Sequence, residues 1–116
     1  MGKSKKQKGE NYLERRPGRP EGLPWHIEKE NTVTLDVENR GFMNRVAQKL
    51  FRKPKVSHIH LDPLGSFVWI HMDGVMDIAE LGKLVKAEFG ESAEPLYERL
   101  AKYFQILDSY SFVEWK

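Results

Sequence analysis

The stretch that decides the fold is residues 61–81, which read LDPLGSFVWIHMDGVMDIAEL. Asp62 followed by Pro63 is typical of a helix start, because the carboxylate can cap free backbone N–H groups and proline fits the first helical turn. The residues after them are apolar almost all round, so they predict a helix that is buried on several sides. The Asp-Gly pair at 73–74 then ends this helix.

Two more helices are predicted further along the chain. Asp77 and Glu80 form a capping-box pattern, and the apolar residues of 78–89 follow at helical spacing until Gly90 ends the helix. Ser92 is the predicted N-cap of the last helix, whose first turn accepts proline. The inner stripe of that helix comprises Leu96, Leu100, Tyr103, Phe104 and Leu107.

Short extended segments are predicted on the N-terminal side. Residues 25–27 and 32–37 flank a turn at 30–31, and the second of them alternates apolar and polar residues, so the two predict a β-hairpin. Residues 56–61 alternate again and predict a third strand. One face of that strand carries Ile59 and Leu61, and the other carries Val56, His58 and His60.

The order of these elements predicts an α+β, winged-helix-like domain, in which a small antiparallel three-stranded sheet packs against three helices. Residues 42–53 lie between the second and third strands and predict an inserted basic helix, since the stretch 40–55 holds six basic residues and no acidic one. Residues 1–22 are rich in lysine, glycine and proline and predict a disordered basic arm. The folded domain is expected to cover residues 23–116.

The composition excludes several classes of function. The chain contains no cysteine, which excludes disulfides, thiol nucleophiles and thiolate metal sites. No apolar run approaches the roughly 20 residues that span a bilayer, so we expect a cytoplasmic protein without a membrane partner. His58 and His60 share a strand face, but the sequence fixes no third ligand, so neither a metal nor a cofactor is predicted. No phosphate loop or nucleophile motif is present, and no enzyme activity is expected.

Three segments in a fixed order resemble the PqqD family, namely Leu61–Trp69, Met72–Gly74 and Ile78–Leu81. The spacing continues through Leu100–Phe104, and the whole resemblance runs from about Trp25 to Trp115. It implies a non-catalytic peptide chaperone that binds the leader segment of a ribosomally synthesised precursor peptide and presents it to a modifying enzyme, often a radical S-adenosylmethionine enzyme. The resemblance concerns this binding mode and does not specify pyrroloquinoline quinone as the product.

The resemblance also implies a site. The leader would add a strand to the exposed sheet edge at 56–61, beside a groove walled by the helix at 94–107. The peptide-binding residues carried over are Val56, His58, Ile59, His60, Leu96, Arg99, Leu100 and Tyr103. The alternative for Leu96, Leu100 and Tyr103 is that they belong to the core, as an apolar stripe on a helix usually does.

The inserted basic helix has two interpretations. Arg45, Lys49 and Arg52 could contact an acidic leader peptide or an acidic patch on the modifying enzyme. Alternatively, they form only the solvated face of an amphipathic helix.

Two partners other than a peptide are consistent with the sequence. A winged-helix DNA- or RNA-binding regulator is the main alternative, because the arm and the inserted helix are basic. Glu91, Glu94 and Glu98 would repel a nucleic-acid backbone from the last helix, so nucleic acid is the less favoured partner. An exposed sheet edge also allows two copies to pair as a homodimer.

Overall fold

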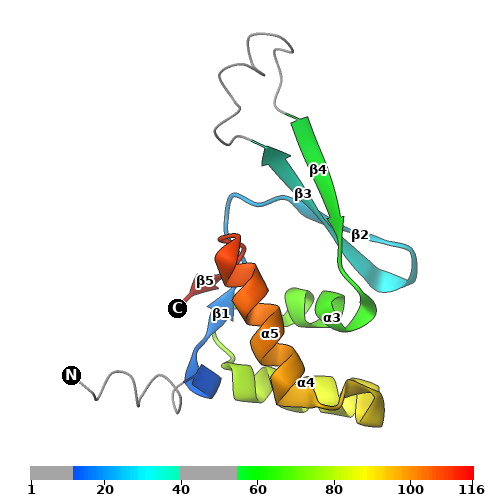
Figure 1. Cartoon of the computed structure of the whole chain (residues 1–116), viewed down its shortest axis with the longest axis vertical. Coiled ribbons are helices and arrows are strands. Elements are labelled where there is room, and N and C mark those ends of the chain that lie inside the picture. Colours follow the sequence, from blue (N-terminus) through cyan, green and yellow to red (C-terminus); the bar gives the residue numbers. More distant parts are fainter. Residues whose placement is uncertain (1–11, 40–54) are drawn as a thin grey trace, which may run out of the picture.

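The structure is a computed structural model that describes residues 12–39 and 55–116. Its main body combines a small antiparallel sheet with three helices (Figure 1). The strands are β2 (Trp25–Glu28), β3 (Thr32–Asn39) and β4 (Lys55–His60), and the helices are α3 (Pro63–His71), α4 (Ile78–Phe89) and α5 (Leu96–Ser109). The α+β class predicted from the sequence is therefore confirmed.

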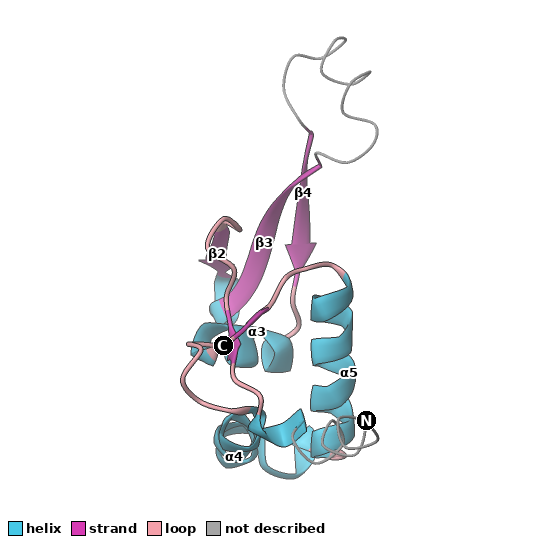
Figure 2. Ribbon diagram, turned by 90° about the vertical axis from the view of Figure 1, so that its left-hand side faces the viewer, coloured by secondary structure: helices cyan, strands magenta, loops and turns pink. Residues whose placement is uncertain are grey.

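The three strands run in the order β2-β3-β4, with each neighbouring pair antiparallel. The predicted hairpin between β2 and β3 is present, and its turn is the short 3-10 helix η2 (Lys29–Asn31). Glu30 and Asn31 both take left-handed backbone angles there, with φ of 58° and 60°. In Figures 1 and 2 the C-terminal end of β4 lies next to the helices, and the other end of the β3–β4 pair projects away from them.

Two of the three helix starts lie where the sequence predicts them. The Asp62 carboxylate accepts a hydrogen bond from the Gly65 N–H at 2.7 Å. Asp77 and Glu80 form the complete capping box. The last helix begins later than predicted, at Leu96, because proline at 95 disfavours helical angles in the residue before it. Residues Gly90–Ala93 form the separate 3-10 helix η3 instead.

The core lies between one face of the sheet and the helices. Val33 and Leu35 of β3, Trp69 of α3 and Phe104 of α5 are all fully buried. The buried hydroxyl of Ser66 accepts from the Val33 N–H at 2.8 Å, so it joins α3 to the sheet with its polar group satisfied. The prediction that α3 is buried on several sides is confirmed.

The folded segment described by the structure includes residues before 23, where the sequence analysis placed the start of the domain. Residues 12–22 were expected in a disordered arm, but the structure folds them against the helices. They contain the 3-10 helix η1 (Tyr12–Glu14) and the strand β1 (Pro17–Gly18), which pairs with the C-terminal strand β5 (Glu114–Trp115). The Arg15 guanidinium stacks 3.8 Å from the centre of the Trp115 ring. Backbone pairing and a cation–π contact hold this segment in place. The segment contains few apolar residues, so its sequence does not indicate that it is folded.

Some sequence predictions fall outside the described residues. These are the basic helix at 42–53, with Arg45, Lys49 and Arg52, and the first part of the arm, residues 1–11. Within the described residues, no helix has both the length and the apolar character needed to cross a membrane.

Candidate functional site

The outer strand of the sheet, β4, offers an open edge. It pairs with β3 on one side only, and no other described strand pairs with it. The Leu61 N–H donates to the Val33 carbonyl at 2.9 Å, which fixes the alternation of hydrogen-bonded pairs along the two strands. The N–H and C=O groups of Val56, His58 and His60 therefore point away from β3, along the open edge.

The side chains of β4 divide between the two faces of the sheet as the sequence predicts. Ile59 is paired with the buried Leu35, so it lies on the face that packs toward the helices, yet it remains 38% exposed. His58 and His60 lie on the opposite face with Val56, which is 41% exposed. Figure 2 shows β4 as the strand farthest from β2 in the sheet. The edge thus combines unpaired main-chain groups with exposed apolar side chains.

Helix α5 exposes fewer of the predicted peptide-binding residues than the sequence analysis expected. Leu96 and Leu100 are buried in the core, as the alternative interpretation of the stripe expected, so they line no open surface here. Arg99 donates to the Ser92 carbonyl at 2.8 Å and so joins α5 to η3.

Tyr103 closes the space between α5 and the start of α3. Its hydroxyl donates to the Gly65 carbonyl at 2.8 Å, and its ring lies so close that a Cβ at Gly65 would stand 3.0 Å from it. Burial raises the pKa of the Tyr103 phenol far above its usual value. Because α3 follows β4 after only two residues, Tyr103 marks the face of α5 that is turned toward the end of β4.

Two exposed residues on that same face of α5 were missed by the sequence analysis. Ile106 is 49% exposed and Tyr110 is 63% exposed, and they follow Tyr103 by three and seven residues, which is helical spacing. The Tyr110 ring stacks on Phe112, with 5.5 Å between ring centres. The helical spacing of these two residues from Tyr103 is the signal in the sequence that could have identified them. It would have done so if Tyr103 had been predicted to lie at the boundary of the core. Ile59, Ile106 and Tyr110 are thus three of the exposed large apolar side chains of the described residues.

A row of hydrogen-bonded histidines and carboxylates covers the solvent face of the sheet. His26 contacts the carboxylates of Asp36 and Glu28 at 2.8 and 2.9 Å, and His58 contacts Asp36 at 2.7 Å. Hydrogen bonds from the carboxylates raise the pKa of His26, and the two histidines lower the pKa of Asp36. His60 bonds instead to the hydroxyl of Thr34, at 2.9 Å. Within the described ranges, no group of three or more metal-binding side chains is arranged to hold a metal ion.

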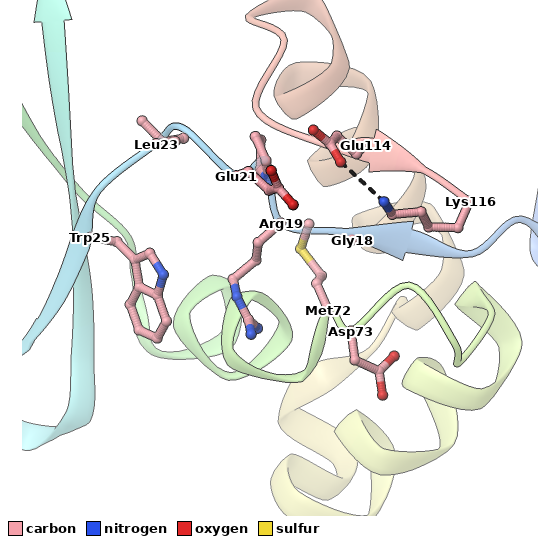
Figure 3. A pocket seen from close by; sticks show the side chains of 10 residues that line it. Gly18, Arg19, Glu21, Leu23, Trp25, Met72, Asp73, Glu114 and Lys116 are labelled. Atoms are coloured by element: carbon pink, nitrogen blue, oxygen red, sulfur yellow. Dashed lines mark hydrogen bonds and ion pairs between the residues drawn. The ribbon is translucent and has the colours of Figure 1, made fainter.

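A separate pocket of about 420 Å³ lies between the N-terminal segment, the end of α3 and the C-terminal strand (Figure 3). Its charged lining residues are Arg19, Glu21, Asp73, Glu114 and Lys116. The Arg19 guanidinium donates to two carbonyls at the end of α3, at 2.7 and 3.0 Å, and the Lys116 ammonium donates to Glu114 at 3.2 Å. Both cations are thus engaged within the fold. None of the predicted peptide-binding residues lines this pocket, so the edge of β4 is the better candidate site.

The fold and this edge define a small α+β domain whose outer strand, β4, pairs with β3 on one side and with no described strand on the other. The chain matches the model of a family described as coenzyme PQQ synthesis protein D (PqqD) over residues 31–113. It therefore belongs to the PqqD family, as the resemblance in the sequence predicted. No curated protein and no solved structure matches it.

Membership of this family supports a role in recognition during biosynthesis by peptide modification. The family is known as a non-catalytic accessory family, and its members typically have a precursor peptide and a modifying enzyme as partners.

Proposed function

We propose that this protein is a peptide chaperone that binds the leader segment of a ribosomally synthesised precursor peptide as an added strand on β4. It then presents the peptide to a modifying enzyme of the radical S-adenosylmethionine type and carries out no chemistry itself. The observation that carries the proposal is the open edge of β4, where Val56, His58 and His60 direct their main-chain groups outward. Strand addition gives such groups their hydrogen bonds, and side-chain pockets then select the sequence.

Exposed apolar side chains on β4 and on the last helix support the same proposal. An added strand places alternate side chains on the two faces of the sheet. Those on the helical face would meet Ile59 and the exposed side chains of Ile106 and Tyr110. Burying exposed apolar area of this kind contributes roughly 25 cal/mol per Å² before the costs of association. The proposed site therefore consists of Val56, His58, Ile59 and His60 together with the face of α5 that follows Tyr103.

The test is a selection of short random displayed peptides on the whole chain, followed by calorimetry of the selected peptides and of duplex DNA. Strand addition predicts peptide binding that Val56→Pro weakens by about tenfold, because one outward N–H is lost while the ladder to β3 remains. Ser57→Pro is the matched control, since residue 57 faces β3 in the ladder and its change should lower stability instead.

Two outcomes would contradict the proposal. One is binding of duplex DNA alone with a steep dependence on salt, which would indicate a nucleic-acid-binding domain. The other is pairing of two copies through β4 so that peptides are excluded, which sedimentation at increasing protein concentration would reveal.

A further inference from the structure

His26 shows what the solvent face of this sheet can hold. Its Nδ1 lies 2.8 Å from the Asp36 carboxylate and its Nε2 lies 2.9 Å from the Glu28 carboxylate. An ionised carboxylate only accepts hydrogen bonds, so both ring nitrogens must donate, and an imidazole that donates twice is an imidazolium. The raised pKa of His26 agrees with this geometry. Here a histidine is kept charged by one carboxylate on each side.

His58 repeats half of that arrangement on the outer strand. Its Nδ1 lies 2.7 Å from the second oxygen of Asp36, while its side chain is 57% exposed. None of the described residues bonds to its Nε2. Because β4 is the outer strand, the next strand outward is the one that a bound peptide would supply. The row that runs Glu28, His26, Asp36, His58 therefore ends on an imidazole, where the alternation would place a further carboxylate.

We propose that His58 selects an acidic residue in the bound peptide, so that an Asp or Glu carboxylate on the added strand bonds to Nε2 of His58 and completes this row. The inference rests on the proposed function and names the class of peptide that the edge accepts. Side chains opposite each other on neighbouring strands have Cβ atoms about 4.5–5.5 Å apart. That separation allows a carboxylate to reach an imidazole, as Asp36 reaches His58 from β3.

Binding of such a peptide should take up a proton. Among the side chains that the structure describes, the charged and titratable groups on this face are His26 and Glu28 on β2, Asp36 on β3 and His60 on β4. While His58 is neutral, carboxylates outnumber cations on this face and an acidic residue is repelled. Protonation of His58 adds the donor and the positive charge together. Affinity for an acidic peptide should therefore be higher at about pH 5.5 than at about pH 8.

The experiment uses the whole chain and a library of short random displayed peptides, selected at about pH 5.5 and at about pH 8, on the two sides of the histidine range. We expect Asp and Glu to be enriched at the lower pH. A selected peptide should bind about tenfold more tightly than its Glu→Gln or Asp→Asn counterpart at the lower pH, the effect of one pKa unit. The preference should disappear at the higher pH.

Two variants assign the effect to its residue. His58→Gln keeps an amide donor for Asp36 but cannot be protonated, so it should abolish the preference for the acidic peptide. His60→Gln is the comparison on the same face and edge. Because His60 belongs to the proposed site, the variant is judged by the ratio of the two affinities, acidic peptide over amide counterpart, and not by affinity itself. That ratio should stay near tenfold at the lower pH, because His60 bonds to the Thr34 hydroxyl at 2.9 Å and lies 3.7 Å from the Glu28 carboxylate.

Failure of this inference differs from failure of the proposed function. Peptides that bind the edge, as Val56→Pro reports, but show no preference for an acidic residue at either pH would overturn the role of His58. So would a preference that survives in His58→Gln. If no peptide depends on the β4 edge, the proposed function fails and this inference fails with it.

Discussion

Replacing Tyr103 by phenylalanine should destabilise the fold although the residue belongs to the predicted peptide-binding set. The lost hydroxyl donates to the Gly65 carbonyl at 2.8 Å in a partly buried contact. A neutral buried hydrogen bond contributes about 1 kcal/mol to the free energy of unfolding. The Gly65 carbonyl also accepts within the ladder of α3, so the loss should stay near that figure. For a domain of this size, 1 kcal/mol corresponds to a melting temperature lower by roughly 4–8 °C.

Urea unfolding followed by circular dichroism measures this loss, and Tyr110→Phe is the matched control. Tyr110 lies on the same helical face but is 63% exposed, so its change should alter the free energy of unfolding by less than about 0.5 kcal/mol. The assignment of Tyr103 to the fold would be refuted if Tyr103→Phe were as stable as the unaltered protein. It would also be refuted if both variants lost the same amount.

Three further predictions concern the surface, a helix cap and pH. Tyr110→Ala should weaken binding of a selected peptide about fivefold or more, with little change in melting temperature, since ring burial at an interface commonly contributes 1 kcal/mol or more; calorimetry checks this. Asp77→Ala should lower the free energy of unfolding by about 1 kcal/mol, because the capping box at α4 is lost; urea unfolding measures it. Carboxylates raise the pKa of His26, so the stability from its charged form is fully present below the ordinary value of about 6.5 and is lost as pH rises through the higher folded value. Urea midpoints compared between about pH 6 and about pH 9 should therefore fall less in His26→Gln than in the unaltered protein, and equal slopes would contradict this.

The elements that the sequence predicted best are those whose signals are local. Asp62 and Asp77 mark helix starts because a capping side chain bonds to backbone only a few residues away. The alternation in β3 and β4 likewise states which side chains share a face. Such features require no knowledge of distant parts of the chain, so they were predictable.

The elements that the sequence missed depend on partners far along the chain. β1 becomes ordered by pairing with β5 nearly a hundred residues later, and Tyr12 donates to the Ala101 carbonyl at 3.3 Å. Neither strand carries a periodic pattern, since each has only two residues. β1 also lies outside both the matched range and the stretch that resembles the family, so the resemblance did not indicate it either.

The candidate site was predictable in part for the same reason. The edge strand and the division of its side chains between the two faces follow from strand order and alternation. The exposure of Ile106, which the predicted α5 stripe does not include, does not follow from them, because it depends on how the helix is turned against α3.

Amide hydrogen exchange along β4, followed by NMR with and without a selected peptide, tests the central claim most directly. The N–H groups of Val56, His58 and His60 point to the open edge, so strand addition predicts that these three become protected when the peptide binds. The outward N–H groups of Trp25 and Ile27 on the opposite edge should be unchanged. Peptide binding that leaves the amides of β4 unprotected, or that protects β2 instead, would contradict the account.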